Sequence, residues 1–338
     1  MQFTRISALV TIVFLFVGTS AQAQTLKAVK DKGQVVCGVS EGLPGFSAPD
    51  AQKRWKGFDA DFCRALAAAI FNDIEKVSFV PLSADDRFPA LQQKKIDVLT
   101  RNTTWTLGRE AGLAVEFPAT TYYDGQGFMV RKTMNIESAI ELADKKVCTQ
   151  TATTTELNLA DFFRNNRINY TAVTFPTADD ALKGYGSGQC DALTSDVSQL
   201  HGLRVKLSQP ADHAILPDVI SKEPLGPVVR QDDVQWMNIV KWVHFAMING
   251  EELNVGQGTI DEAMKSQKPD IRRLLGVEGT FGEQLGLTKD WSARVIRLVG
   301  NYAEVYERNL GATTQLAIPR GINSLWDKGG IQYAPPIR

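Results

Sequence analysis

Short apolar runs alternate with amphipathic stretches through the first part of the chain. The runs at 35–39, 77–80 and 96–100 are typical of buried strands. Apolar side chains at every fourth position predict a helix at 58–71, and a shorter helix is expected at 88–94. Strands that alternate with helices in this way indicate a mostly parallel sheet with helices on both faces.

The same order of elements then occurs a second time. Strands are predicted at 146–150, 170–175 and 188–194, and helices at 156–164 and 178–185. The phrases IDVLT and CDALT occupy matching places in the two units. The pattern therefore predicts two α/β lobes, here called lobe 1 and lobe 2.

Two further segments connect these lobes. A short apolar strand is predicted at 127–130, and the segment 221–230 contains two prolines that restrict the backbone, as in a defined crossover back to lobe 1. We therefore assign residues 24–126 to the first part of lobe 1, 127–225 to lobe 2 and 226–338 to the return into lobe 1.

The rest of the chain has mainly helical patterns. Helices are predicted at 236–248, 271–275 and 293–306, whereas 318–338 is expected to be coil with short turns. We expect this long extension to add packing to lobe 1.

The first 23 residues have the pattern of a secretory signal peptide. Arg5 supplies a positive charge, the apolar stretch at 8–17 is too short to cross a bilayer, and Ala21 and Ala23 fit the small-residue cleavage rule. The mature chain is therefore expected to begin at Gln24 and to be exported.

Charge and composition exclude several classes of function. The net charge is −1 and no basic patch occurs, which argues against nucleic acid as a partner. The three histidines are isolated from one another and from the cysteines, and no CxxC motif is present, so neither a metal site nor a cofactor is expected.

Four cysteines in an exported chain indicate disulfides, for which three pairings exist. Cys37 and Cys148 lie in the first strand of each lobe. Cys63 lies on the helix beside the first of these strands, and Cys190 begins a strand expected to neighbour the second. The local order favours Cys37–Cys63 and Cys148–Cys190, because a bridge between the lobes would prevent them from moving relative to each other.

Polar side chains follow the predicted strands where ligands bind in open α/β sheets. In lobe 1 they lie at 101–104, and in lobe 2 they are Ser195 and Asp196. Arg109 follows nearby, and its planar guanidinium matches the two oxygens of a carboxylate. A buried Asp196 carboxylate would require a cationic partner. The two lobes thus predict a cleft for a small zwitterion.

One segment also resembles a known family. Asp97, Thr104, Thr106 and Arg109 follow the pattern D-x6-T-x-T-x2-R, and an acidic-Phe pair and a Tyr pair come after it. This spacing is similar to that of the periplasmic amino-acid-binding proteins of ABC importers. The phrases GLPGFSAPD, TRNTTWT, YYDGQGFMV, TTTELNLADFF, SKEPLGPVVR and GNYAEVYERNLG resemble the general L-amino-acid-binding subfamily.

The resemblance implies a two-lobed type II periplasmic binding fold, often called a Venus flytrap. It implies a monomer without cofactor that binds L-amino acids by hinge closure and delivers them to permease subunits in the inner membrane. It further implies that Arg109 and Thr104 contact the ligand carboxylate, with Thr154 as the contact from lobe 2. The backbone carbonyl of Asn102 and the side chain of Asp196 would receive the ammonium.

The resemblance also locates a side-chain pocket, whose expected residues are Ser40, Leu43, Phe46 and Gln150. Relatives with one cognate ligand often carry an aromatic residue where Leu43 stands and an acid where Ser40 stands, so broad specificity is expected here. Ala152 replaces the usual glycine of the lobe 2 turn, and Thr153 with Glu156 fits a capping box.

Two other functions remain as alternatives. Periplasmic dehydratases that act on prephenate or arogenate share this fold, and fold alone does not settle function. The expected site residues are suited to bind a carboxylate and an ammonium, and they include no histidine or cysteine nucleophile. This favours a binding protein over an enzyme. A ligand-sensing lobe for a signalling partner is the second alternative.

Overall fold

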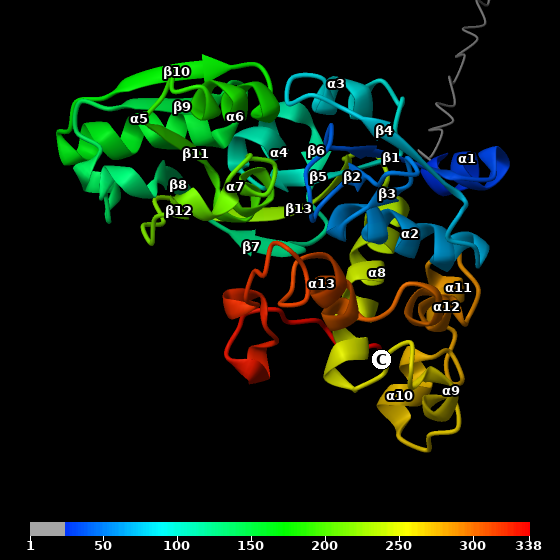
Figure 1. Cartoon of the computed structure of the whole chain (residues 1–338). Helices are drawn as coiled ribbons and strands as arrows, with labels where there is room; N and C mark the ends of the chain where they lie inside the picture. Colours follow the sequence, from blue (N-terminus) through cyan, green and yellow to red (C-terminus); the bar gives the residue numbers. More distant parts are fainter. Residues whose placement is uncertain (1–23) are drawn as a thin grey trace, which may run out of the picture.

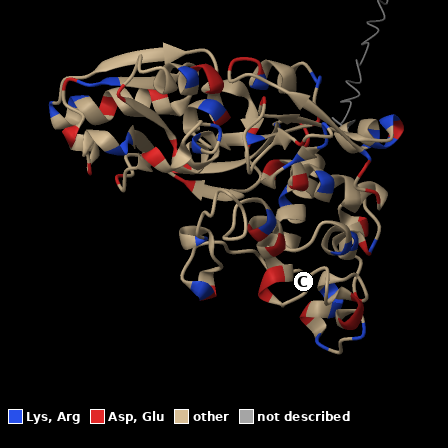
Figure 2. Ribbon diagram, in the orientation of Figure 1, with Lys and Arg blue, Asp and Glu red and all other residues tan. Residues whose placement is uncertain are grey.

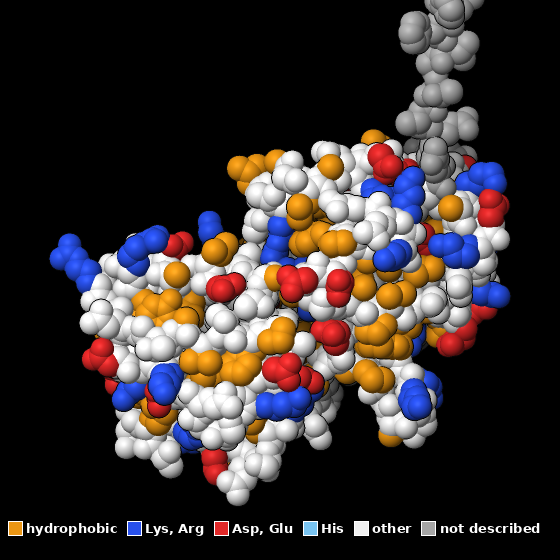
Figure 3. Space-filling view, turned by 90° about the horizontal axis from the view of Figure 1, so that it is seen from above, with side chains coloured by type: hydrophobic (Ala, Val, Ile, Leu, Met, Phe, Trp, Pro, Cys, Tyr) orange, Lys and Arg blue, Asp and Glu red, His pale blue; other side chains and the backbone are white. Residues whose placement is uncertain are grey.

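The computed structural model describes residues 24–338 as two α/β lobes that lie side by side, with a helical extension below lobe 1 (Figure 1). The predicted signal peptide, residues 1–23, lies outside the described residues. Lysines and arginines are interspersed with acidic residues over both lobes, and the face in Figure 3 shows charges of both signs (Figures 2 and 3). No helix in the part 24–338 is long and apolar enough to span a bilayer.

The sheet of lobe 1 has the strand order β4-β1-β5-β13-β6, with β7 paired to β13. Its strands are β1 (Val35–Val39), β4 (Val77–Pro81), β5 (Val98–Thr104), β6 (Val115–Glu116), β7 (Tyr122–Asp124) and β13 (Glu223–Arg230). The three parallel strands β4, β1 and β5 are those that the sequence predicts, and β13 adds an antiparallel neighbour. A small ribbon of β2 (Ala48–Pro49) and β3 (Trp55–Lys56) lies beside this sheet.

Helices cover both faces of this sheet. Successive residues of a strand point to opposite sides, so neighbouring residues of β5 pack against different helices. Val98 packs in one core with α2 (Phe58–Phe71), whereas Leu99 packs in another with α3 (Arg87–Gln92). Two further helices of lobe 1 are α1 (Gln24–Lys32) and α4 (Leu107–Leu113).

The sheet of lobe 2 has the order β10-β9-β11-β8-β12. Its strands are β8 (Gln126–Arg131), β9 (Lys146–Gln150), β10 (Thr171–Phe175), β11 (Ala192–Asp196) and β12 (His213–Ile215). Phe128 packs toward α5 (Thr154–Asn166), and its neighbour Met129 packs toward α6 (Ala178–Gly186) and α7 (Val197–Arg204). Helices therefore flank this sheet on both sides as well.

Strands β5 and β11 extend beyond the ends that we expect from the sequence. Thr103 and Thr104 continue β5 and pair with β13, and Ser195 and Asp196 continue β11 and pair with β8. These polar residues therefore belong to the strands, whereas the predicted strand ends at 100 and 194 imply that they follow them. The physical reason is that the antiparallel crossover strands continue the hydrogen-bond ladder after the parallel neighbours have ended.

The chain passes between the two sheets twice. Gly125 separates β7 of the lobe 1 sheet from β8 of the lobe 2 sheet. The segment predicted as a crossover returns as strand β13, which begins at Glu223 and pairs with β7 from its first residue. The second passage therefore comes before Glu223, earlier than the predicted boundary after residue 225.

The extension packs on lobe 1 and contains α8 (Val234–Glu252), α9 (Ile260–Ala263), α10 (Pro269–Leu274), α11 (Phe281–Gln284), α12 (Trp291–Leu298) and α13 (Tyr302–Asn309). The single helix predicted at 293–306 is in fact two. Gly300 adopts a φ of 106°, and Asn301 caps α13 through a capping box with Glu304, so the chain turns there. Asn323 then bonds to both the N–H and the carbonyl of Tyr123, which ties the tail to β7.

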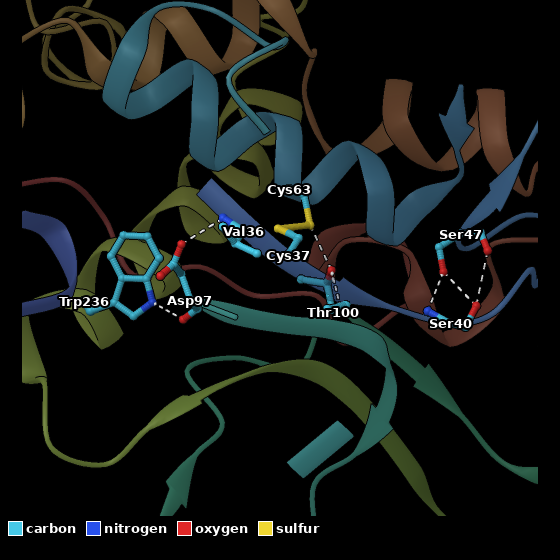
Figure 4. The surroundings of a disulfide bond; sticks show 9 residues. Val36, Cys37, Ser40, Ser47, Cys63, Asp97, Thr100 and Trp236 are labelled. Carbon is cyan, nitrogen blue, oxygen red and sulfur yellow. Dashed lines mark hydrogen bonds between the residues drawn. A yellow bond between two sulfur atoms is a disulfide. The ribbon is translucent and has the colours of Figure 1, made fainter. Parts of the chain in front are cut away.

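Both disulfides have the predicted pairing, Cys37–Cys63 and Cys148–Cys190. Figure 4 shows the first bridge between β1 and α2. Beside it, Asp97 accepts a hydrogen bond from the backbone N–H of Val36, and its carbonyl accepts one from the indole of Trp236 (Figure 4). The aspartate that begins the recognised sequence pattern therefore holds β1, β5 and α8 together.

Replacing both Cys148 and Cys190 by serine is expected to destabilise the protein, because this bridge closes a loop with a sequence separation of 42. The chain-entropy relation gives a loss of about 4 kcal/mol. Urea unfolding of the double variant and the wild type measures this difference. An unchanged midpoint, or four titratable thiols in the unreduced wild type, would contradict the assignment.

Candidate functional site

Two connected cavities lie between the lobes. The inner cavity is lined by Arg87, Arg101, Asn102, Thr104, Arg109, Gln150, Thr153, Thr154, Thr155, Ser195, Asp196 and Gln199. The outer cavity is lined by Ser40, Glu41, Gly42, Leu43, Arg101, Asn102, Gln150, Thr177, Ala178, Asp179, Gln199, Leu203 and Lys206. Both lobes contribute to each cavity, and four residues line both.

Arg109 enters the inner cavity from the first turn of α4. Thr106 caps this helix by accepting a hydrogen bond from the Arg109 backbone N–H, and the guanidinium donates to the Thr104 carbonyl over 2.7 Å. The ring of Phe88 lies 5.6 Å from the guanidinium carbon. Burial lowers the pKa of Arg109, and the carboxylates of Glu223 and Asp196 oppose that shift. The side chain is therefore fixed in place as a cation.

Asp196 ends β11 on the opposite side of the inner cavity. The residue is 6% exposed, and its carboxylate forms no hydrogen bond or ion pair with any residue of the described part. Burial raises its pKa well above the usual range, with further contributions from Asp124 and Glu223, while Arg109 and Arg87 act in the other direction. Such a carboxylate is stabilised by a cation placed in the cavity.

Glu223 is a buried acceptor that no local sequence pattern marks. Its carboxylate accepts hydrogen bonds from both lobes: from Thr104 at 2.6 Å, Thr154 at 3.0 Å, Asn158 at 2.7 Å and Ser221 at 2.7 Å. A hydroxyl has a single proton to donate, so Thr104 and Thr154 direct theirs to Glu223. Both threonines line the inner cavity, but their expected direct bonds to a ligand carboxylate are not available in this arrangement.

Backbone N–H groups of α5 offer another donor set at this point. The first N–H groups of a helix have no partner within the helix. Thr153 forms no cap, since its hydroxyl donates to the Gln150 carbonyl at 2.7 Å, so the predicted capping box is wrong. Ala152 adopts a left-handed φ of 59°, a conformation that a glycine would adopt more easily.

Two other arginines line the inner cavity, Arg87 and Arg101, at 3% and 7% exposure. Arg87 is the first residue of α3, one residue before the predicted start of that helix, and no local pattern marks it. In the sequence, Arg101 is marked only as part of a polar strand end. Burial lowers the pKa of both, that of Arg101 to about 10.

The lobes touch each other across the cleft. The Asn102 amide donates to Gln199 over 3.0 Å, and the Arg87 guanidinium donates to the Ala152 carbonyl over 3.3 Å. Gly202 of α7 lies so close to the first loop of lobe 1 that an added Cβ would meet the Pro44 carbonyl at 2.9 Å. The structure thus has the lobes closed on each other. Asn102 itself has a φ of 32°, held by its N–H bond to the Asp59 carboxylate.

The residues predicted for the side-chain pocket separate into two groups. Ser40, Leu43 and Gln150 line the outer cavity, and the Ser40 hydroxyl pairs with that of Ser47 at 2.8 Å. Phe46 lines neither cavity, so its assignment to the pocket is wrong. Its ring is 1% exposed and packs edge-on against Phe58 and Tyr122 in the core of lobe 1. No cluster of metal-ligating side chains occurs within 24–338.

Comparisons with known proteins place the chain in a family. The family described as bacterial extracellular solute-binding proteins, family 3, matches residues 35–256. The chain is 53% identical, over 98% of both chains, to the general L-amino acid-binding periplasmic protein AapJ of Rhizobium johnstonii. It is 47% identical to the glutamate/glutamine/aspartate/asparagine-binding protein BztA of Rhodobacter capsulatus, over 95% of this chain and 96% of that one.

A solved structure is also similar. The ABC transporter periplasmic binding protein from Brucella ovis, determined with glutathione bound, superposes with a TM-score of 0.92 at 50% identity. The match covers 93% of this chain and 99% of that one.

Asp196→Asn is expected to stabilise the ligand-free protein at neutral pH. The folded-state pKa of Asp196 lies above its unfolded value of 3.8, so at pH values between the two the folded protein holds a proton that the unfolded chain has released. The free energy of unfolding therefore falls as pH rises above 3.8, and this loss is complete above the folded pKa. The pKa of Asp124 is also raised, to about 6, so Asp124 lowers the free energy of unfolding with rising pH in both the wild type and the variant.

Calorimetric melting temperatures at pH 4 and pH 7.5 measure this effect. The gain of the Asn variant over wild type is expected to be small at pH 4 and largest at pH 7.5. Asp161→Asn on the exposed face of α5 is the matched control and should show no such pH-dependent gain. A variant less stable than wild type at pH 7.5 would contradict the account of Asp196.

Proposed function

The chain belongs to the bacterial extracellular solute-binding proteins of family 3, and we propose that it is the periplasmic subunit that supplies L-amino acids to an ABC importer. The observation that carries the proposal is the inner cavity, where Arg109 of lobe 1 and Asp196 of lobe 2 present opposite charges without pairing to each other. An α-amino acid offers a carboxylate and an ammonium on adjacent atoms. It can compensate both charges at once.

Each of the two groups is recognised by both lobes. The guanidinium of Arg109 and the free N–H groups of α5 bind the carboxylate, while Asp196 and the carbonyl of Asn102 bind the ammonium. Ligand contacts from both lobes exist together only when the cleft is shut, so binding shifts the protein toward the closed state. The permease subunits in the inner membrane then receive this closed form.

The space next to the site supports broad specificity. The outer cavity continues the inner one and is lined by residues of several kinds, without an aromatic side chain. A long side chain can therefore extend into it from an α-amino-acid group bound at Arg109 and Asp196. Glutathione, which the Brucella ovis relative binds, begins with such a group in its γ-glutamyl residue.

We propose that the protein is a monomeric binding protein and not an enzyme. Neither histidine nor cysteine lines the inner cavity, and the relatives described above are binding proteins. Assays of prephenate and arogenate turnover distinguish the dehydratase alternative. Turnover well above the uncatalysed rate would overturn our assignment, and a gene neighbourhood without permease and ATPase genes would favour the sensor alternative.

Arg109→Ala should abolish binding of every amino acid while the protein stays folded. Removing one partner of a buried charge pair costs about 2–5 kcal/mol, which is roughly 30-fold to several thousand-fold in affinity. Asp196→Asn should also weaken all ligands by a similar factor, because the ammonium is common to them. Calorimetry with alanine, glutamate and arginine measures both variants. Near wild-type affinity for Arg109→Ala, or a loss at Asp196 confined to arginine, would contradict the proposed roles.

Gly202→Val tests closure apart from ligand contact, since Gly202 lines neither cavity. The added side chain meets the Pro44 carbonyl and should keep the lobes from shutting fully. We expect weaker binding of all amino acids and a smaller ligand-induced decrease in the radius of gyration by X-ray scattering. Gly186→Val, where an added Cβ would have an ordinary contact with Leu207 at 3.7 Å, is the control. Unchanged affinity in the Gly202 variant would contradict the closure mechanism.

A further inference from the structure

The cleft contains more positive charge than the two ends of an amino acid require. Arg87, Arg101 and Arg109 all line the inner cavity, and Asp196 is the one carboxylate among its lining residues. None of the three guanidiniums lies within ion-pair distance of a carboxylate of the described chain. A zwitterion bound at Arg109 and Asp196 is neutral overall, so it leaves the other two buried cations without a direct ionic partner.

Arg101 has a distinctive position among these cations. Four residues line both cavities, namely Arg101, Asn102, Gln150 and Gln199, and Arg101 is the charged one. Its Nε donates to the Leu82 carbonyl over 2.8 Å, which anchors the side chain. Its two terminal nitrogens form no hydrogen bond with a residue in the range 24–338, and the residue lines both cavities.

No acid of the described chain pairs directly with Arg101. The Asp59 carboxylate accepts the Asn102 N–H at 2.9 Å and acts on Arg101 only from beyond ion-pair distance. Glu41 belongs to the outer cavity and acts on Arg101 only at longer range. A guanidinium that is 7% exposed and has free donors is costly to bury unless a ligand supplies the acceptor.

We propose that Arg101 is a specificity-determining residue that binds a carboxylate or carboxamide at the end of the ligand side chain. The preferred substrates are then amino acids with acidic or amide side chains, and γ-linked compounds that carry the same carbonyl. This inference rests on the proposed function, because it places the α-amino-acid group at Arg109 and Asp196. The planar fork of Arg101 suits two oxygens of a carboxylate and one oxygen of an amide.

Arg87 is the alternative cation and has a different environment. It lines the inner cavity but not the outer one, and it already donates to the Ala152 carbonyl of lobe 2. Its contact holds the closed cleft together and does not reach the junction. Removing Arg87 should therefore weaken all ligands alike, which makes Arg87→Met the matched control for Arg101→Met.

The test compares three ligands of similar length by calorimetry: L-glutamate, L-glutamine and L-norvaline, whose side chain ends in a methyl group. Arg101→Met should lower the affinity for glutamate by about 30-fold or more and for glutamine by about 10-fold. Affinity for norvaline should stay within about threefold, since an uncharged side chain loses no partner. Arg101→Lys keeps the charge without the fork and should give an intermediate loss for glutamate.

Several outcomes would overturn the inference. An equal loss for all three ligands in Arg101→Met, or a glutamate-selective loss in Arg87→Met alone, would remove Arg101 from the side-chain subsite. The wild-type protein provides a test that depends on no variant: norvaline bound as tightly as glutamate would contradict the proposal. If the folded wild type binds none of the three, the proposed amino-acid function fails instead, so the two failures are distinguishable.

Discussion

Opposite charges that face one cavity from different lobes are the constraint on which this structure depends. Arg109 comes from lobe 1, Asp196 comes from lobe 2, and neither is paired with a carboxylate or guanidinium among residues 24–338. Charges in such surroundings are stabilised only by a partner of matched shape and sign. The rest of the cleft maintains this arrangement. Glu223 accepts from Thr104 and Thr154, one from each lobe, so those hydroxyls are held to the crossover strand.

The fold places these charges by extending strands past their parallel neighbours. Asp196 occupies the last position of β11 because β8 pairs with it there, and Thr104 occupies the last position of β5 because β13 does the same. The antiparallel partners are the strands by which the chain passes between lobes. In each lobe, crossover and binding residues thus share a hydrogen-bond ladder, and the C-terminal tail is attached to the sheet of lobe 1 through Asn323 and Tyr123. A movement of the lobes therefore changes the positions of the binding residues directly.

Much of this could be predicted from the sequence, because it depends on local pattern. The strand and helix order, the disulfide partners and the positions of Arg109 and Asp196 follow from periodicity, export and motif spacing. Glu223 and Arg87 could not be found in this way. Their roles come from contacts with residues far away in the chain, at Thr104 and Ala152. Phe46 was misassigned for a similar reason, since a loop phenylalanine can face the core or the cleft, and packing against Tyr122 decides between them.

The central claim is that the two lobes together bind the carboxylate and the ammonium of one α-amino acid. Calorimetry with L-glutamine, with the same molecule lacking its amino group, and with the same molecule lacking its α-carboxylate tests this claim most directly. The account predicts that L-glutamine binds and that each analogue binds at least about 30-fold more weakly, since each leaves one buried charge without a partner. Analogue binding as tight as that of L-glutamine would contradict it.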